Sequence, residues 1–208
     1  GSIQTVTGNP GSVTHVYTND GFTNGIIVSA TDEDGTYTPS DLYVTSFATN
    51  QLFRYDGQTG VPLSASAAIA NPVDVRIGPD GLLYVTEFGS NDIDRFDPAT
   101  GLFVDTFVYG QSGGLQQPSR MAFGADGNLY VSSQNSGNIL KFSGTDGRSL
   151  GVFVPSGAGG LTSPDGLTFG PDGHLYVSSF ADGDIRRYEG KTGAFLNTFA
   201  SFGTATHI

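Results

Sequence analysis

The sequence predicts an all-β protein, a β-propeller of four clear four-stranded blades together with an irregular N-terminal β segment. The triplet Leu-Tyr-Val occurs four times, at residues 42–44, 83–85, 129–131 and 175–177. The spacings of 41, 46 and 46 residues are typical of propeller blades. Glycine supplies 31 of the 208 residues and recurs between short apolar runs. This distribution indicates hairpin turns between strands rather than disorder.

Each repeat unit is expected to contain four short strands. The first strand ends at an Asp-Gly pair, found at residues 80–81, 126–127 and 172–173, where glycine supplies the positive φ of a tight turn. The second strand carries Leu-Tyr-Val, the third ends in a basic and an aromatic residue, and the fourth follows a glycine. Apolar side chains fall on both faces of the second strand. We therefore expect sheets stacked face to face around an axis.

The chain is expected to be a single domain with an internal division. Residues 41–208 hold the repeats, whereas residues 1–40 lack the Gly-x-Asp-Gly turn and contain three irregular strand-like stretches. Three arrangements remain open from these patterns. The N-terminal strands and the C-terminal strand form a degenerate fifth blade that closes the ring, the chain is a fragment, or a missing strand comes from another subunit.

Residues 164–179, Pro-Asp-Gly-Leu-Thr-Phe-Gly-Pro-Asp-Gly-His-Leu-Tyr-Val-Ser-Ser, resemble an NHL repeat. The resemblance covers about residues 41–200 and is greatest to secreted bacterial NHL proteins that carry a PEP-CTERM sorting tail. It implies a propeller outside the cell or at its surface, but no particular activity, because one fold hosts many functions. Propellers of similar architecture include lactonases that hold a divalent cation and virginiamycin B lyase-like enzymes that depend on histidine.

The composition excludes several classes of partner. The formal net charge is −11, with nine Lys and Arg residues, so a nucleic-acid backbone or an anionic membrane surface would be repelled. No run approaches the roughly 18 apolar residues of a transmembrane helix. Cysteine is absent, which excludes disulfide and thiolate chemistry. An acidic, cysteine-free chain rich in Gly, Ser and Thr fits an extracellular or cell-surface location.

A basic residue recurs on the third strand of each unit, followed two positions later by an acidic or hydroxyl residue. Residues i and i+2 share one face of a strand, so one interpretation is a ring of ion pairs on one rim. The favoured interpretation is solvated charges of small energetic worth. The pairs are Arg54 with Asp56, Arg95 with Asp97, Lys141 with Ser143, and Arg187 with Glu189.

Candidate binding residues are those at which the repeats differ. The start of each first strand lines the channel mouth of a propeller, and there Asp74, Arg120 and Asp165 are expected to converge near the axis. Glu87 is a fourth candidate. Together they predict a site for a small polar ligand, and the alternative is polar residues that face a wet channel.

A metal site or a catalytic site has weak support in the sequence. The best cation candidate is Asp32-Glu33-Asp34-Gly35, with Asp32 and Asp34 as Ca²⁺ ligands, but it lacks the later bidentate Glu of an EF-hand loop. The Glu, Asn and Asp set of the lactonases cannot be placed. The histidines, His15, His174 and His207, lie in the irregular ends or just after a turn. We therefore expect no catalytic residues and no cofactor.

The sequence favours a non-catalytic structural or binding module that associates with copies of itself. Strand donation through the N-terminal arm would produce oligomers or fibres. The alternative is a lactonase- or lyase-like propeller enzyme with a metal in its channel. The residues expected to take part in assembly are Val13, His15, Tyr17, Ile26 and Val28.

Overall fold

Four antiparallel sheets, each with four strands in sequence order, make up the described part of this computed structural model, which is residues 26–27, 41–66 and 68–202. We call the sheets blades 1 to 4. Blade 1 holds β1 (Ile26–Ile27), β2 (Leu42–Ser46), β3 (Gln51–Tyr55) and β4 (Pro62–Ala65); blade 2 holds β5 (Pro72–Ile77), β6 (Leu83–Glu87), β7 (Ile93–Phe96) and β8 (Phe103–Val108). Blade 3 holds β9 (Pro118–Phe123), β10 (Leu129–Ser133), β11 (Asn138–Phe142) and β12 (Ser149–Val154); blade 4 holds β13 (Pro164–Phe169), β14 (Leu175–Ser179), β15 (Asp184–Tyr188) and β16 (Phe195–Ser201).

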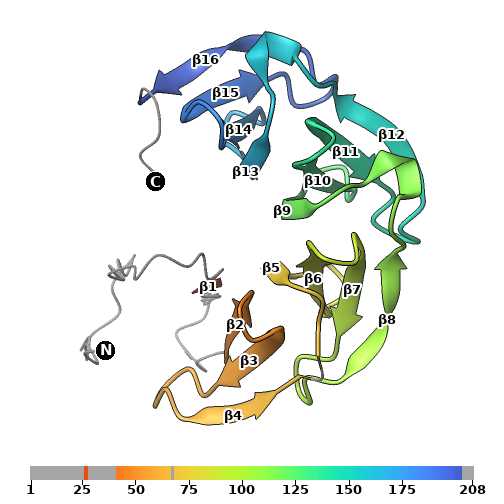
Figure 1. The fold of residues 1–208 in the computed structure, drawn as a ribbon, viewed down its shortest axis with the longest axis vertical. Coiled ribbons are helices and arrows are strands. Elements are labelled where there is room, and N and C mark those ends of the chain that lie inside the picture. Colours follow the sequence, from red (N-terminus) through yellow and green to blue (C-terminus); the bar gives the residue numbers. More distant parts are fainter. Residues whose placement is uncertain (1–25, 28–40, 67, 203–208) are drawn as a thin grey trace.

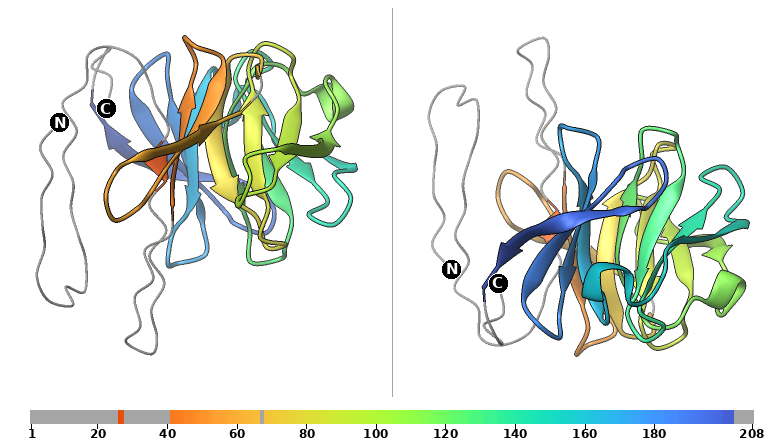
Figure 2. Two further views of the ribbon diagram at one scale, coloured as in Figure 1. Left: turned by 90° about the horizontal axis from the view of Figure 1, so that it is seen from below. Right: turned by 90° about the horizontal axis from the view of Figure 1, so that it is seen from above.

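The blades stand side by side around an arc, with β5, β9 and β13 innermost and β4, β8, β12 and β16 outermost (Figure 1). The side views show the blades stacked one behind another (Figure 2). This arrangement confirms the predicted propeller architecture. Blade 1 also has a first strand, because Ile26 of β1 pairs with Val44 of β2. Short 3₁₀ turns, η1 (Ser112–Gly114) and η2 (Ala158–Gly160), lie in the two longer linkers between blades.

The Asp-Gly pairs form the expected hairpin turns between the first and second strands. Gly81 has a φ of 82°, and its N–H donates to the carbonyl oxygen of Gly78 at 3.0 Å. Gly127 and Gly173 adopt the same conformation, with φ of 75° and 74°. Glycine is needed there because other residues are strained at positive φ.

The apolar core lies between blades rather than inside any one of them. Tyr84 of blade 2 is fully buried between two rings, Phe107 of its own blade and Phe123 of blade 3, with ring centroids 5.0 and 5.2 Å away. Tyr130 is buried in the same way between blades 3 and 4. Burial of a large apolar side chain contributes roughly 1.5–3 kcal/mol. Contacts between blades are therefore the main stabilising interaction of the fold.

Each blade has two faces that differ in composition. The trailing face, toward the next blade, carries the Tyr of Leu-Tyr-Val and an aliphatic residue of the third strand, and in blades 2 to 4 also a Phe of the fourth, as in Tyr84, Ile93 and Phe107. The leading face, toward the preceding blade, carries Leu and Val of that triplet, as in Leu129 and Val131. Each junction joins one trailing face to one leading face. None of the helical turns in the described ranges is long and apolar enough to cross a membrane.

Candidate functional site

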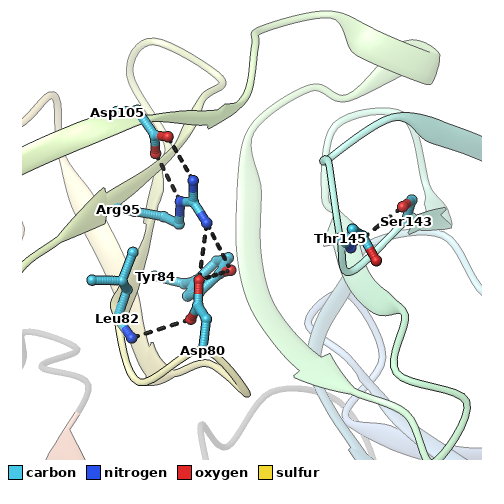
Figure 3. Close-up of polar contacts among 7 residues, drawn as sticks. All are labelled: Asp80, Leu82, Tyr84, Arg95, Asp105, Ser143 and Thr145. Atoms are coloured by element: carbon cyan, nitrogen blue, oxygen red, sulfur yellow. Dashed lines mark hydrogen bonds and ion pairs between the residues drawn. The ribbon is translucent and has the colours of Figure 1, made fainter.

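A network of charged and aromatic side chains joins the strands of blade 2 (Figure 3). Asp80, in the first turn, accepts hydrogen bonds from the hydroxyl of Tyr84 at 3.0 Å and from the guanidinium of Arg95 at 2.9 Å. Arg95 also donates to both carboxylate oxygens of Asp105, at 2.7 and 2.5 Å. Hydrogen bonding to Arg95 lowers the pKa of Asp105. The network ties β6, β7 and β8 to the Asp-Gly turn.

Part of this network recurs in the next two blades, where the turn carboxylate again accepts a hydrogen bond from the Tyr hydroxyl and lies beside the basic side chain of the third strand. Lys141 contacts Asp126 at 2.8 Å, and Arg187 lies 3.6 Å from Asp172. The basic side chains therefore reach the turn between the first and second strands. The structure therefore has ion pairs in place of the favoured solvated charges, and their partner is the turn carboxylate rather than the residue two positions later, because the hairpin brings that carboxylate closer.

The acidic residues two positions after each basic residue close the next turn instead. Asp56 accepts hydrogen bonds from the N–H of Thr59 at 2.7 Å and from its hydroxyl at 2.7 Å. Asp97 accepts the same pair from Thr100, and Glu189 accepts N–H groups of Lys191 and Thr192. These hydrogen bonds to the charged form lower the pKa of all three carboxyls.

Asp74 and Arg120, two of the predicted channel residues, are brought together between blades 2 and 3. Asp74 is 2% exposed, and its carboxylate accepts hydrogen bonds from the N–H of Met121 at 3.1 Å and from Arg76 at 3.2 Å. Arg120 donates to the carbonyl oxygen of Val73 at 2.7 Å. Burial raises the pKa of Asp74, and the two arginines oppose that rise. The hydrogen bond between Asp74 and Met121 links blade 2 to blade 3. A role of Asp74 in ligand binding stays a prediction.

Asp165 lies beside this cluster, whereas Glu87 lies elsewhere. The backbone oxygen of Asp165 accepts a hydrogen bond from the hydroxyl of Ser119 at 3.2 Å. Glu87 follows Thr86, whose hydroxyl accepts the N–H of Asp74 at 2.9 Å. Because successive side chains of a strand point to opposite faces, Glu87 is directed away from Asp74. The structure thus brings Asp74 and Arg120 together, places the backbone of Asp165 next to Ser119, and separates Glu87 from them; a ligand site there stays a prediction.

Glu87 is instead paired with a second carboxyl, Asp94 of β7. Glu87 is 6% exposed, and its Oε2 accepts hydrogen bonds from the hydroxyl of Ser90 at 2.9 Å and the N–H of Ala70 at 3.1 Å. Burial, together with the neighbouring Asp94, raises the pKa of Glu87 to about 7. Near neutral pH this pair holds a proton that exposed carboxyls would release.

Among the described residues, nothing covers the trailing face of blade 4 as the next blade covers those of blades 2 and 3. We use this name for Tyr176, Ile185 and Phe199. Phe199 is 58% exposed, whereas its counterparts Phe107 and Phe153 are 7% and 9% exposed. Its ring contacts Tyr176 at 5.0 Å, as in the other blades, but no third ring completes the stack within the described residues.

The leading face of blade 1 is likewise only partly covered. It consists of Leu42, Val44 and Tyr55, which are half-buried. Their counterparts in blade 2, residues 83, 85 and 96, are between 0% and 3% exposed. The trailing face of blade 4 and the leading face of blade 1 thus have the same residue types as the two faces that meet at the junction of blades 2 and 3.

A polar pocket of about 280 Å³ opens at the junction of blades 2 and 3. It is formed by the turn between β6 and β7, the linker that contains η1, and the turn between β10 and β11. The backbone N–H of Gln117 donates to the side-chain oxygen of Asn91 at 2.6 Å, which fastens the linker to the turn. Its lining residues are Phe88, Gly89, Asn91, Gln111, Gln116, Gln117 and Asn135.

Comparison of the two longer linkers could have revealed this pocket in the sequence. Residues 109–118 and 155–164 align without gaps, and Gln111 stands where the second linker has Gly157. Gln111 and Gln117 both adopt positive φ, 67° and 51°. A Gln that holds a conformation suited to glycine marks a position at which the side chain itself matters.

Several predicted residues lie outside the described residues. These are the assembly candidates Val13, His15, Tyr17 and Val28 and the cation candidates Asp32 and Asp34. Ile26 lies in β1, and its role in assembly stays a prediction. Within the described ranges, no group of three or more His, Cys, Asp or Glu residues is placed to hold a metal ion.

Solved structures with the same fold support the architecture. A catalytically inactive virginiamycin B lyase from Staphylococcus aureus, solved with quinupristin, matches 91% of this chain and 58% of its own, with 21% identity and a TM-score of 0.62. Hydrazine synthase from Kuenenia stuttgartiensis matches 79% of this chain and 47% of its own, with 15% identity and a TM-score of 0.64. A Bacteroides caccae protein of unknown function has 13% identity, a TM-score of 0.60 and coverage of 85% and 67%.

Searches of protein-family models and of curated proteins found no match. The chain spans about half the length of the first two structures. At these identities the likeness shows the fold alone. The chain therefore has a β-propeller fold, and the resemblance of its repeats to NHL repeats stays a prediction.

Proposed function

We propose that this protein is a non-catalytic, extracellular or cell-surface propeller module that associates with copies of itself. The trailing face of blade 4 would pack on the leading face of blade 1 of the next copy. One observation carries the proposal: Phe199 is 58% exposed at a position that is buried in blades 2 and 3. The sequence-based proposal of strand donation by the N-terminal arm predicts self-association too, through a different contact.

A second copy is the occupant because the chain carries both halves of the contact. The junctions of blades 2 and 3 and of blades 3 and 4 join a Tyr–Phe stack to a face of Leu, Val and an aromatic residue. The trailing face of blade 4 supplies the former and the leading face of blade 1 the latter. Blades 1 and 4 stand at opposite ends of the arc of described blades (Figure 1). Contact between copies reproduces a junction that the fold already forms.

Such a contact is heterologous, since different surfaces of the two copies meet. A heterologous contact produces a closed ring when its rotation closes and an open filament when it does not. Exposed apolar side chains clustered on one face typically mark an interaction surface. This favours a structural role over the capture of a small substrate.

Replacement of Phe199 by lysine tests the proposal. A buried lysine at the junction would be left without a partner, so Phe199→Lys is expected to abolish association. The matched control is Leu102→Lys. Leu102 is 67% exposed and directly precedes β8, the outermost strand of blade 2, so it belongs to neither of the two proposed contact faces. Sedimentation velocity over a wide concentration range measures the distribution of species.

The expected result is concentration-dependent assembly of the wild-type protein and of Leu102→Lys, and a monomer for Phe199→Lys. A wild-type protein that stays monomeric at high concentration overturns the proposal. That outcome would indicate that another part of this chain covers the face.

A lyase-like enzyme is the second candidate, supported by the likeness to the virginiamycin B lyase structure. His174 is the histidine of the described ranges, and its Nδ1 is buried without a hydrogen-bond partner. Incubation with quinupristin, with and without added divalent cations, followed by mass spectrometry of the products, tests this alternative. Turnover that is lost in His174→Ala would support it, and its absence under all conditions would exclude it.

A further inference from the structure

We propose that the pocket at the junction of blades 2 and 3 binds one or two sugar units of a neutral glycan. This inference does not depend on self-association, since the pocket lies within one copy. Its lining contains five side-chain amides and one aromatic ring but no charged residue. A site without charge, on a chain with a net charge of −11, favours a neutral ligand over an anion.

Amides suit hydroxyl groups because each amide offers an acceptor oxygen and a donor nitrogen side by side. Two of the five are engaged with each other, since Asn135 donates to the side-chain oxygen of Gln116 at 2.9 Å. The side-chain amides of Gln111 and Gln117 make no hydrogen bond with any described residue, although the backbone N–H of Gln117 donates to Asn91. They are therefore available to a ligand that both donates and accepts hydrogen bonds.

The pocket has the size and the apolar wall that a sugar ring needs. Its volume of about 280 Å³ lies just below the range of roughly 300–1,000 Å³ for pockets that hold drug-sized molecules. Phe88, half-buried, lies in its lining and contacts Phe47 edge to face at 5.9 Å. An aromatic side chain of this kind can pack against the C–H groups of a sugar while amides bind its hydroxyls.

The second linker shows that the fold does not require Gln111. Gln111 and Gly157 occupy the same position before their 3₁₀ turns, with φ of 67° and 82°. Glycine adopts this conformation without strain, whereas glutamine does not. The same comparison places Ser163 where the first linker has Gln117. The amides are thus specific to one junction, although the backbone of the two linkers is alike.

The test uses the full chain and a panel of neutral probes, namely maltohexaose, cellohexaose and chitohexaose. Two-dimensional ¹H–¹⁵N NMR reports the side-chain NH₂ groups of Gln111 and Gln117 directly. We expect at least one probe to shift these signals in a saturable manner. The variant Gln111→Gly, which copies the sister linker, is expected to weaken that binding about tenfold, as loss of hydrogen bonds to one amide implies. Its melting temperature should stay equal or rise.

The matched control is Gln58→Gly, since Gln58 is exposed in a turn of blade 1 and lies outside the pocket. It should leave binding unchanged. The inference is overturned if no neutral probe shifts the two NH₂ signals, or if Gln111→Gly binds as the wild type does. It is also overturned if only an anionic probe, oligogalacturonate, or a neutral peptide of Gly and Ser produces the shifts.

Discussion

At the scale of single residues, the basic side chain of the third strand is the centre of each blade's polar network. The guanidinium of Arg95 contacts two carboxylates and a tyrosine hydroxyl, and its central carbon lies 4.9 Å from the ring centroid of Phe107. Isolated exposed ion pairs contribute little. Arg95 combines a bidentate pair with a cation–π contact while its side chain is 19% exposed, so its contribution is larger.

Arg95→Met is expected to lower the free energy of unfolding by about 1–2 kcal/mol, because it leaves Asp80 and Asp105 without their shared cation. Urea denaturation measures the change. Arg148→Met serves as the control, since Arg148 is exposed, and it should alter stability by less than about 0.5 kcal/mol. Equal effects of the two substitutions would contradict this account of the network.

Glu87 predicts a dependence of stability on pH. Its pKa is raised from 4.5 to about 7 by burial and by Asp94, so the folded state holds more protons than the unfolded state between these values. The contribution of Glu87 to the free energy of unfolding is therefore fully present below pH 4.5 and is lost as pH rises through 7. Glu87→Gln should remove this loss, worth on the order of 1–3 kcal/mol at pH 8.

Thermal unfolding of the wild type and of Glu87→Gln between pH 4 and pH 8 measures this effect. The control is Glu189→Gln, because Glu189 lies in a turn and its pKa is lowered rather than raised. Parallel pH profiles for the wild type and Glu87→Gln would show that Glu87 does not carry the raised pKa.

Residue-level predictions from the sequence succeeded where a conformation is local and failed where partners come from other strands. The positive φ of Gly81 follows from its place in a two-residue turn. The partner of Arg95 did not follow from the i+2 rule, because Tyr84 lies opposite Arg95 across the hairpin and brings Asp80 with it. The pocket amides come from three loops, and their meeting depends on the stacking of blades.

At the scale of elements, the turns between the third and fourth strands set how closely blades approach. A Cβ atom on Gly147 would overlap the carbonyl oxygen of Phe107 in blade 2. Gly193 meets Phe153 in the same way one junction later. Gly60, the counterpart in blade 1, meets no described atom within 4 Å. Glycine at these positions therefore serves the junction as well as the turn.

This difference predicts unequal costs for two equivalent substitutions. Gly60 and Gly147 share a φ of 69°, so alanine adds the same backbone strain of roughly 1–2 kcal/mol at either site. Gly147→Ala should cost at least about 2 kcal/mol more than Gly60→Ala, because it also separates two blades. Denaturant unfolding of both variants gives the comparison, and equal costs would show that the junction tolerates the extra carbon.

The strands themselves were predictable because their pattern repeats. Leu-Tyr-Val begins β2, β6, β10 and β14, and each Asp-Gly pair precedes its strand as expected. The sequence predicted an irregular strand over residues 25–29, which includes β1, but did not assign it to blade 1, since it is not followed by the Asp-Gly turn of the other units. Pairing with β2 defines this strand, and such pairing is a tertiary contact that a single sequence does not reveal.

At the scale of the whole molecule, the packing of one blade on the next accounts for the stability of the fold and is the basis of the proposed self-association. Every internal junction buries a trailing face on a leading face, and the described blades leave one of each uncovered. The sequence pointed to self-association through its irregular ends. The structure adds two faces of defined chemistry, one with Phe199 and one with Tyr55, and the proposed contact would join these faces in two copies.

The most direct test mixes two variants that each lack one face. Tyr55→Lys removes the leading face of blade 1, and Phe199→Lys removes the trailing face of blade 4. Each variant alone is expected to sediment as a monomer, whereas an equimolar mixture forms dimers and nothing larger, because one intact face of each kind remains. Variants that stay monomeric when mixed, or that assemble singly as the wild type does, would contradict the head-to-tail contact between blades 4 and 1.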